Sequence, residues 1–547
     1  MERIPFTTWE ETRARFQLDV PETFNFGRDV VDDWAETKPD ALCLIWQNDH
    51  GADLRYTWAE MRRLTNQFAN ALTSAGVGKG DRVIIMLPRI PEWQIAMVAC
   101  FKMGAIPIPC IEMLTEKDIA YRAQHAGATA AVTVGRSAHK FAEIDGLTAR
   151  FAVGGADGWS DFGAAIAEQS EAFEADDTGG EDPVALYYTS GSTGLPKGVT
   201  FAARGLFVWR ISGWYWQDFR EDDLVWCTAD TGWSKAGTGI LIAPWSCGAC
   251  VYFYDGAFDP SDRLRRITDN KVTVFCAAAT EFRRLVQEEL RPDAFGHLRL
   301  TATAGESVNP DTVTAWQAAT GSPLVESYGQ TETLMTIANH AELEPRSGSM
   351  GKPLPGTKVA ILDPTHAALP TGEIGELALE LPTPGLMLGY WNDPERTAAT
   401  FAESNGQRYF LTGDQARVDA EGYVYYEGRT DDIISSAGYR IGPMEVENAL
   451  VSHPAIVEAA AVAAPDPDRG EIVKAYIVLS SGYEPDPMLA ADIQDHVKQQ
   501  TAPYKYPRAI AFVDELPKTA TGKVLRRALK ARAQAEADNA GALRPMS

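Results

Sequence analysis

The sequence predicts an α/β fold with two parts: a large N-terminal domain of several subdomains with mainly parallel sheets plus a β-rich subdomain, and a small α+β domain at the C-terminus. Two observations predict the large domain: short apolar strands alternate with helices over the first 300 residues, and Gly/Pro turns separate short strands from about Gly351. A third is a new strand–turn–helix unit near residue 430. The chain has 547 residues, of which 45% are hydrophobic and 23% charged, which is typical of a soluble protein with more than one domain.

The first elements are clear in the pattern. Residues 57–76 predict a helix, because Thr57 and Glu60 form a capping box, apolar residues recur at spacings of three and four, and Gly76 supplies a stop. Residues 81–87 predict a buried strand, and a helix opened by Pro91 follows. Strands are expected at 105–109 and 129–134, so these units should form a parallel sheet.

The same alternation returns between Lys271 and Glu306, with a strand at 271–278, a helix at 280–290 and a strand at 298–306. The charged turn near residue 430 predicts a boundary between a domain of residues 1–429 and one of residues 430–547. The Ala-rich end from Ala531 is expected to be a frayed helix end or disordered.

The net charge of −25 disfavours binding to nucleic acids or to anionic membranes. If the protein binds an anion, it must therefore gather positive charge locally. From Lys498 to the end there are ten Lys/Arg and four Asp/Glu, so the last segment is the expected place.

The seven cysteines form no paired framework, which indicates a reducing compartment. Cys247 and Cys250 are the only close pair, and no second pair completes a metal site, so small residues at the start of a buried strand are the favoured interpretation. The first twenty residues lack the pattern of a signal or transit peptide, and no apolar run is long enough to span a bilayer. The sequence therefore predicts a cytoplasmic protein without stable membrane insertion.

The stretch from Tyr187 to Thr200, YYTSGSTGLPKGVT, has the composition of an anion-binding loop. Glycines let backbone N–H groups point at an anion, hydroxyl groups add donors, and Lys197 adds charge. The spacing differs from the GxxxxGK of the usual phosphate loop. A flexible Gly/Ser linker is the alternative interpretation.

This loop resembles the phosphate-binding signature of the adenylate-forming superfamily, which includes acyl-CoA synthetases, adenylation domains of peptide synthetases, and luciferases. Further motifs of that family follow in its order: ESYGQTE at 326–332, TGD at 412–414, GRTDD at 428–432, SAGYRIGPMEVE at 436–447 and PKTATGKVLRR at 517–527. TADTGW, PDPDRGEIVKAYIVL and TAPYKYPR are most similar to the medium-chain acyl-CoA synthetase branch. The resemblance covers roughly residues 30 to 530.

The resemblance implies a ligase with two half-reactions. A carboxylate attacks the α-phosphate of MgATP to give acyl-AMP and diphosphate, and the thiol of CoA then attacks the acyl carbon and expels AMP. ATP, Mg²⁺ and CoA are the implied cofactor and co-substrates, and a small carboxylic acid is the other partner. The C-terminal domain is expected to be a mobile lid that rotates about Asp431 between the half-reactions.

The resemblance also implies roles for single residues. Lys523, Thr331 and Arg440 are the expected catalytic groups, with Lys523 bridging the acid and the α-phosphate, and Glu332 is the expected Mg²⁺ ligand. The remaining expected ATP and AMP contacts are Thr189, Ser190, Gly191, Ser192, Thr193, Gly194, Lys197, Gly305, Glu306, Ser307, Glu326, Ser327, Tyr328, Gly329, Asp414 and Arg429.

For CoA, the expected residues are Gly438 and Tyr439 beside the pantetheine channel and Arg469 and Arg508 at the phosphates. The acyl pocket is expected at Trp233 and Gly329. Acetyl-specific relatives have a tryptophan in place of this glycine, so we expect a medium-chain, branched or aromatic acid rather than acetate. Phe201 stands near a position where many members carry a histidine, and six tryptophans between 209 and 245 are mostly expected to be core.

Alternatives remain open from the sequence. An enzyme that loads a carrier protein, an aryl-CoA ligase and a luciferase-like oxygenase would share the fold. A catalytically dead nucleotide sensor is the alternative of another class, and intact Lys523, Glu332 and Asp414 argue against it.

Overall fold

The computed structural model describes residues 3–189, 195–306, 308–436, 439–466, 469–501, 504–518 and 524–542. Tertiary contacts divide the chain into two compact units, Met1–Lys358 with Leu381–Phe401, and Val359–Glu380 with Ala402–Ser547. The segment after residue 351, which the sequence predicts to be β-rich, contributes to both units. The division into residues 1–429 and 430–547 stays a prediction.

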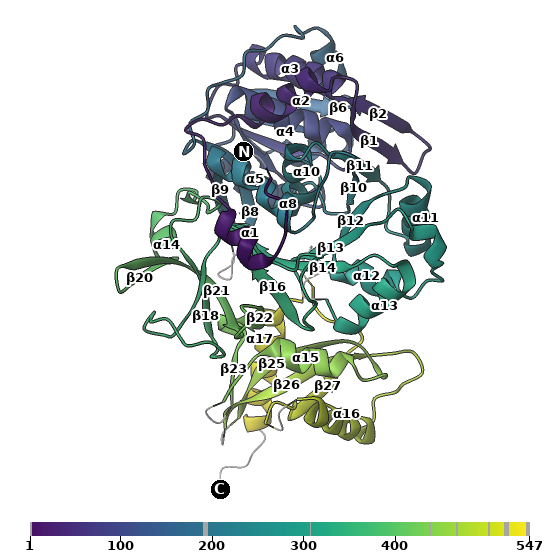
Figure 1. Ribbon diagram of the computed structural model, residues 1–547, viewed down its shortest axis with the longest axis vertical. Coiled ribbons are helices and arrows are strands. Elements are labelled where there is room, and N and C mark those ends of the chain that lie inside the picture. The colour runs from purple at the N-terminus through teal and green to yellow at the C-terminus, as the bar shows by residue number, and fades with distance from the viewer. Residues whose placement is uncertain are drawn as a thin grey trace. The chain divides into compact units, whose positions relative to one another are not determined.

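The first unit contains a large sheet with a parallel centre (Figure 1). Strands β14 (Leu324–Gln330), β13 (Leu300–Ala304), β12 (Val274–Ala277), β10 (Leu224–Cys227), β11 (Cys250–Asp255) and β1 (Leu42–Asn48) run parallel in this order. Beyond β1 lies antiparallel β2 (Asp53–Thr57), and beyond β14 lie antiparallel β15 (Leu334–Ala338) and β16 (Ser349–Pro353). The central strands β10 and β12 are apolar throughout, as expected for parallel strands that are covered on both faces.

A second sheet of the same unit is wholly parallel, in the order β4 (Ile106–Pro109), β3 (Arg82–Met86), β5 (Ala130–Val134), β6 (Ala149–Val153) and β7 (Ser160–Asp161). Its helices are α3 (Trp58–Ser74), α4 (Pro91–Met103), α5 (Glu116–Ala126) and α6 (Phe162–Ala167). The expected capping box of α3 is confirmed, since the Thr57 hydroxyl accepts from the Glu60 amide and the Glu60 carboxylate accepts from the Thr57 amide. A third, antiparallel sheet has the order β19 (Gly389–Tyr390), β9 (Lys197–Ala202) and β8 (Pro183–Thr189).

The other helices of the first unit pack around these sheets. They are α1 (Trp9–Arg15), the π-helix η1 (Gly27–Asp32), α2 (Asp33–Thr37), α7 (Ala203–Val208), α8 (Arg210–Tyr215), α9 (Ser234–Gly239), α10 (Ile242–Ser246), α11 (Pro260–Asp269), α12 (Ala279–Leu285), α13 (Pro310–Thr320) and α14 (Pro394–Ala398), with 3₁₀ turns at Gly135–Phe141 and Pro292–Phe295. Helix α12 ends five residues before the expected Leu290. The core between α11–α13 and the large sheet contains Trp226, Phe275, Phe282 and Trp316.

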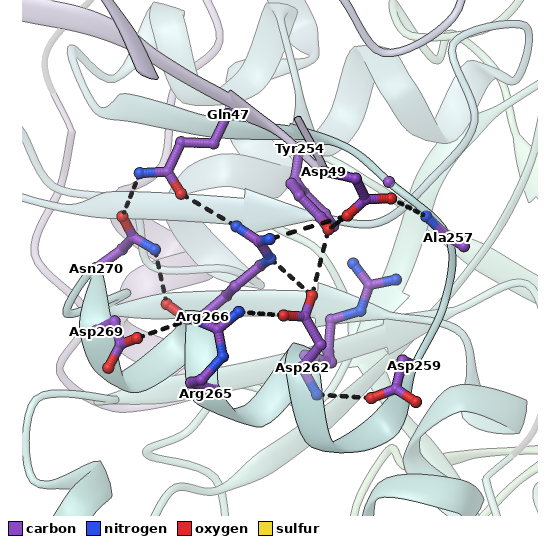
Figure 2. Close-up of polar contacts among 12 residues, drawn as sticks. Gln47, Asp49, Tyr254, Ala257, Asp259, Asp262, Arg265, Arg266, Asp269 and Asn270 are labelled. Carbon is purple, nitrogen blue, oxygen red and sulfur yellow. Dashed lines mark hydrogen bonds and ion pairs between the residues drawn. The ribbon is translucent and has the colours of Figure 1, made fainter. Parts of the chain in front are cut away.

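A polar network joins α11 to strands β1 and β11 (Figure 2). The Arg266 guanidinium lies 3.7 Å from the Tyr254 ring centroid, and its Nε donates to Asp262 over 2.7 Å. Its NH1 also donates to Gln47 Oε1 of β1 over 3.3 Å. All the groups that Figure 2 joins by dashed lines belong to the first unit, and the network fastens α11 to β11 and β1, which lie next to the edge strand β2.

The second unit is β-rich at its start and α+β at its end. Strands β17 (Val359–Leu362), β18 (Gly375–Glu380), β21 (Gln407–Val418) and β22 (Val424–Arg429) are antiparallel neighbours, and β20 spans Phe401–Ser404. The other sheet has the order β24 (Tyr439–Ile441), β23 (Ile434–Ser436), β26 (Gly470–Leu479) and β25 (Ile456–Asp466), with β27 (Ala509–Phe512) beside β26. The helices are the 3₁₀ turn η4 (Thr430–Asp432), α15 (Pro443–Val451), α16 (Pro487–Gln500) and α17 (Arg526–Ala542).

Helix α17 corrects the expectation of a frayed or disordered end. Its Leu529 and Ala533 are buried against β25 and β26, so the helix is part of the core. Among the described residues, no helix is both long and apolar enough to cross a membrane.

Candidate functional site

Several expected nucleotide contacts of the first unit lie at one edge of the large sheet. Gly305 and Glu306 follow β13, Tyr328 and Gly329 lie near the end of β14, and these two strands are parallel neighbours. Ligands of open α/β sheets bind outside the carboxyl ends of the strands. The structure therefore brings these segments together at the edge where a ligand is expected.

Two further expected residues meet at a tyrosine that sequence reasoning missed. Lys197 Nζ lies 3.3 Å from Glu332 Oε1 and donates to Tyr390 Oη over 2.9 Å. The Tyr390 hydroxyl donates to the same Glu332 Oε1 over 2.9 Å. No signal in GYWNDPE marks this tyrosine, because an aromatic residue after a glycine is ordinary in a strand.

Around the predicted phosphate loop, β8 and β9 form an antiparallel pair that sets Thr189 opposite Lys197. The Thr189 hydroxyl is buried and has no hydrogen-bond partner among the residues that the structure describes. The Tyr121 hydroxyl of α5 donates to the Pro196 carbonyl over 3.0 Å and fixes the far end of the loop. A donor without a partner at the loop entrance is suited to an anion. Residues 190–194 of the loop lie outside the described residues.

The acidic residues of this edge hold loops in place. Glu326 Oε1 accepts from the Val308 amide over 3.0 Å, and Glu306 Oε1 accepts from the Thr280 amide over 2.9 Å. Burial raises the pKa of Glu326 to about 7. The Ser327 hydroxyl donates to the Ile337 carbonyl over 2.9 Å within the β14–β15 hairpin. Ser307 lies outside the described residues.

Gly329 and Thr331 belong to the turn that follows β14. A Cβ at position 329 would lie 2.0 Å from the Leu334 carbonyl oxygen, so the hairpin itself requires glycine there. The atoms nearest to this Cβ position belong to the backbone of Leu334 and Met335 and not to an open pocket. The role of Gly329 as a marker of pocket size stays a prediction. The Thr331 and Ser234 hydroxyls lie 3.1 Å apart, which places the Ser234 hydroxyl beside Thr331, the residue before Glu332 in the chain.

The six tryptophans separate into core and candidate pocket. Five of them, Trp209, Trp214, Trp216, Trp226 and Trp245, are buried, and Trp233 at the start of α9 is half-buried. Phe201 stacks on Trp209 at 5.2 Å between ring centroids and is itself buried. Five of these tryptophans therefore belong to the core. Of the six, Trp233 remains the candidate for the acyl pocket.

In the second unit, the structure brings Asp414 and Arg429 together as cross-strand partners of β21 and β22. Arg429 NH1 and the Tyr426 hydroxyl each lie 3.4 Å from Asp414 Oδ1. Gly413 has a φ of +71°, and its amide donates to Glu376 over 3.1 Å. Burial and the neighbouring Asp414 carboxylate raise the pKa of Tyr426. A carboxylate and a guanidinium are thus presented side by side, and Tyr426 is a further residue that the sequence did not reveal.

The expected CoA residues of this unit are described in part. Arg469 Nε lies 3.4 Å from Ser436 Oγ, and Arg508 lies 4.9 Å from the Tyr506 ring centroid, where Lys498 also lies at 4.5 Å. Among the described residues, neither Arg469 nor Arg508 forms an ion pair with a carboxylate. Gly438 lies outside the described residues, and Tyr439 and Arg440 are described only as backbone of β24.

The positive charge of the last segment is less available than its composition suggests. Carboxylates from earlier in the chain pair with it: Glu445 with Lys505, Glu447 with Arg526, Glu458 with Lys518 and Asp432 with Lys530. A count along the segment cannot include such partners. Lys523, the expected adenylation catalyst, lies outside the described residues.

The expected hinge is held by the C-terminal helix. Asp431 lies in the 3₁₀ turn η4, and Lys530 of α17 donates to its carbonyl oxygen. Lys530 Nζ also lies 3.0 Å from Asp432 Oδ1. The hinge role of Asp431 stays a prediction, and the contact with Lys530 is new.

The chemistry of Glu332 fits a magnesium ion. Its Oε1 is occupied by Lys197 and Tyr390, and its Oε2 accepts no hydrogen bond from the described residues. No group of three or more possible ligands is found among the described residues. Mg²⁺ commonly binds one or two carboxylates and completes its shell with water and substrate phosphates, so one free carboxylate oxygen is a suitable site.

The chain belongs to the AMP-binding enzyme family. The model of that family matches residues 31–391, and the model of the AMP-binding enzyme C-terminal domain matches residues 445–523. Within the family it is an AMP-forming acyl-CoA synthetase, an acid–thiol ligase that uses ATP and CoA, as the resemblance of its motifs implied. The predicted α/β fold is also confirmed.

Named relatives support this assignment. The chain is 40% identical to the mouse acyl-coenzyme A synthetase ACSM3, mitochondrial, over 96% of this chain and 93% of the relative. It is 41% identical to the human acyl-coenzyme A synthetase ACSM5, mitochondrial, with the same two coverages. The crystal structure of the anthranilate CoA ligase AuaEII with anthranoyl-AMP is similar with a TM-score of 0.85 and 30% identity, covering 95% of this chain and 99% of that one.

The predicted cytoplasmic location is wrong by this comparison, because the mouse, rat and human relatives are named as mitochondrial enzymes. The prediction rested on the N-terminal composition and on the cysteines. All seven cysteines are free in the structure, which agrees with a reducing compartment but does not choose between compartments.

Proposed function

We propose that the enzyme activates a medium-chain or aromatic carboxylic acid rather than acetate. The half-buried Trp233, set apart from five core tryptophans, is the observation that carries this proposal. Ligand pockets are lined by apolar and aromatic side chains, and each buried CH₂ of an acid adds about 0.8 kcal/mol. An aromatic acid is the second candidate, because the similar AuaEII structure is that of an anthranilate CoA ligase.

In the first half-reaction, an oxygen of the acid forms a bond to the α-phosphorus of ATP, and the bond from that phosphorus to the diphosphate breaks. Thr189 and Lys197 would bind the outer phosphates, and Thr331 would donate to the α-phosphate. Positioning and charge neutralisation are the main demands of this chemistry. Lys523 would neutralise the acid and the α-phosphate as they approach.

Glu332 would hold Mg²⁺ through its Oε2, and the ion would supply positive charge to the phosphate oxygens. Asp414 would accept hydrogen bonds from the ribose hydroxyls, with Arg429 beside it. Glu306, Ser307, Gly305 and Tyr328 would line the adenine site.

In the second half-reaction, the sulfur of CoA bonds to the acyl carbon, AMP leaves with the bonding electrons, and the thiol proton passes to solvent. Arg469 and Arg508 would bind the CoA phosphates, since they lack carboxylate partners among the described residues. Gly438 and Tyr439 would flank the thiol channel, and Arg440 would contact the AMP phosphate. The lid of residues 430–547 would rotate about Asp431 between the two steps.

The test is a specificity panel on purified enzyme with acetate, butyrate, octanoate, benzoate and anthranilate, measured as thioester formation. We expect kcat/KM for octanoate or an aromatic acid to exceed that for acetate by at least about 100-fold, the sum of several buried carbons. A higher kcat/KM for acetate than for octanoate and benzoate would refute the proposed acid class. Transfer of the acyl group to free CoA would speak against the carrier-loading alternative, whereas diphosphate release without CoA is expected of both.

A further inference from the structure

Tyr390 stands between the two charged residues that the proposed function assigns to the phosphates and to Mg²⁺. Its hydroxyl accepts from Lys197 Nζ and donates to Glu332 Oε1, each over 2.9 Å. Its ring also lies against the ammonium group, with 4.5 Å between Lys197 Nζ and the ring centroid. The side chain is 8% exposed, so water competes poorly for these contacts.

The backbone around Tyr390 is bound to both of its neighbours. Strand β19 pairs with β9, so that Tyr390 lies opposite Val199, two residues after Lys197. The Met387 amide donates to the Glu332 carbonyl over 2.9 Å, and the Trp391 amide donates to the Gly198 carbonyl over 2.7 Å. One short segment is therefore hydrogen-bonded on both sides and sets the spacing between β9 and the residue after β14.

We propose that Tyr390 is a positioning residue for MgATP, which limits the contact of Lys197 with Glu332 to one carboxylate oxygen, so that Oε2 stays open to a cation and one N–H of Lys197 stays open to a phosphate. This inference rests on the proposed function of these two residues. The hydroxyl occupies Oε1 of the carboxylate, and Oε2 is left for a cation. The Tyr390 hydroxyl oxygen accepts a hydrogen bond from one of the three N–H groups of Lys197, a second is directed at Glu332 Oε1 over 3.3 Å, and the third can turn to a phosphate.

Loss of the hydroxyl would let the charged pair close. The ammonium and the carboxylate are 3.3 Å apart at present, which is longer than a close charge-assisted hydrogen bond. With phenylalanine at 390, Lys197 can take both carboxylate oxygens, and the pair would then compete with the phosphate and the cation for the same atoms. Hydrogen bonds to charged groups are strong enough that we expect MgATP affinity to fall about 10- to 100-fold.

The experiment compares Tyr390→Phe, Tyr390→Leu and Tyr215→Phe with the unaltered enzyme. Tyr215 is the matched control, because its hydroxyl is likewise a hydrogen-bond donor, to the Ile4 carbonyl over 2.9 Å, elsewhere in the same unit. Binding of MgATP and of Mn²⁺ with a non-hydrolysable ATP analogue is measured by titration calorimetry, without acid or CoA. Thioester formation from supplied acyl-AMP and CoA, which needs neither triphosphate nor its metal ion, is measured beside it.

We expect Tyr390→Phe to weaken MgATP and Mn²⁺ binding while thioester formation from acyl-AMP and the melting temperature stay near those of Tyr215→Phe. Tyr390→Leu should weaken binding further, since it also removes the ring that faces Lys197. Binding by Tyr390→Phe within twofold of the unaltered enzyme would overturn the proposal. An equal fall in binding, thioester formation and melting temperature would also overturn it, because the tyrosine would then be a packing residue. Failure of the proposed function itself would appear differently, as an unaltered enzyme that releases no acid-dependent diphosphate.

Discussion

Substitution of Lys530 by methionine should change the balance between the two half-reactions. Lys530 Nζ donates to the Asp431 carbonyl oxygen and lies 3.0 Å from Asp432 Oδ1. The Asp431 carbonyl follows both backbone angles of its own residue, so a rotation confined to Asp431 would carry it along with α17. We expect the rotation to extend within η4 to the backbone angles of Asp432, which turn the Asp431 carbonyl relative to α17, so that the contact persists in one hinge state only. Methionine keeps the apolar stem and removes the charge.

The size of the effect follows from the exposure of the pair. The Lys530 side chain is 30% exposed and that of Asp432 is 19% exposed, so solvent screens part of the attraction. An exposed ion pair contributes about 0–1 kcal/mol, and a hydrogen bond from a charged donor contributes about 1.5–3 kcal/mol. After screening we expect about 1–2 kcal/mol, which shifts an equilibrium between two hinge states about 5- to 30-fold.

The assay measures two rates on the same preparation: acid-dependent exchange of diphosphate into ATP, and thioester formation from supplied acyl-AMP. We expect the ratio of the two rates to shift about 5- to 30-fold in Lys530→Met. Lys518→Met is the matched control, because Lys518 forms a comparable pair with Glu458 over 2.7 Å without touching η4. Equal changes of both rates, or the same ratio in both variants, would refute the hinge contact as a determinant of the balance.

Three further changes test the structure. Burial raises the pKa of Glu326 to about 7 from 4.5, so the folded state favours the protonated carboxyl group. The contribution of this group to stability is therefore complete below pH 4.5 and is lost as pH rises through 7. Glu326→Gln should raise the free energy of unfolding at pH 8 by about 2–3 kcal/mol with little change at pH 4.5, and equal effects at both pH values would contradict this. Gly329→Ala should lower the melting temperature by several degrees because its Cβ meets the facing strand, whereas Gly296→Ala, with no neighbour within 4 Å, should not; equal melting temperatures would count against the turn geometry. Arg526→Met should cost about 3 kcal/mol in urea unfolding because it leaves Glu447 buried without its charge partner, and an unchanged midpoint would show that the pair is unimportant.

Local patterns of the sequence predicted the fold well. The capping box at Thr57 and Glu60, the Pro91 start of α4 and the apolar strands were all found where expected, since their signals are contained in a few adjacent residues. The end of α12 was misjudged because the helical pattern continues to Leu290 although the helix ends at Leu285. Helix α17 was misjudged because Ala-rich composition does not reveal the strands that bury its face.

Those residues of the candidate site that lie in family motifs could be predicted from the sequence. Glu332, Lys197, Asp414 and Arg429 were identified from motifs, and the structure joins them in two pairs, one in each unit. Tyr390 could not be found, because its meaning depends on contacts with residues about 60 and 190 positions away in the chain. The same holds for carboxylates that neutralise the C-terminal cations, which come from other segments and are invisible to a local count of charge.

The most direct test of the account is acid-dependent exchange of labelled diphosphate into ATP by the enzyme and by its Lys523→Ala variant, with octanoate and with benzoate. We expect exchange by the unaltered enzyme and a loss of at least about 100-fold in the variant, while thioester formation from supplied acyl-AMP continues. Exchange that is undiminished in Lys523→Ala, or absent from the unaltered enzyme with every acid, would contradict the claim that this lysine serves the formation of an acyl-adenylate.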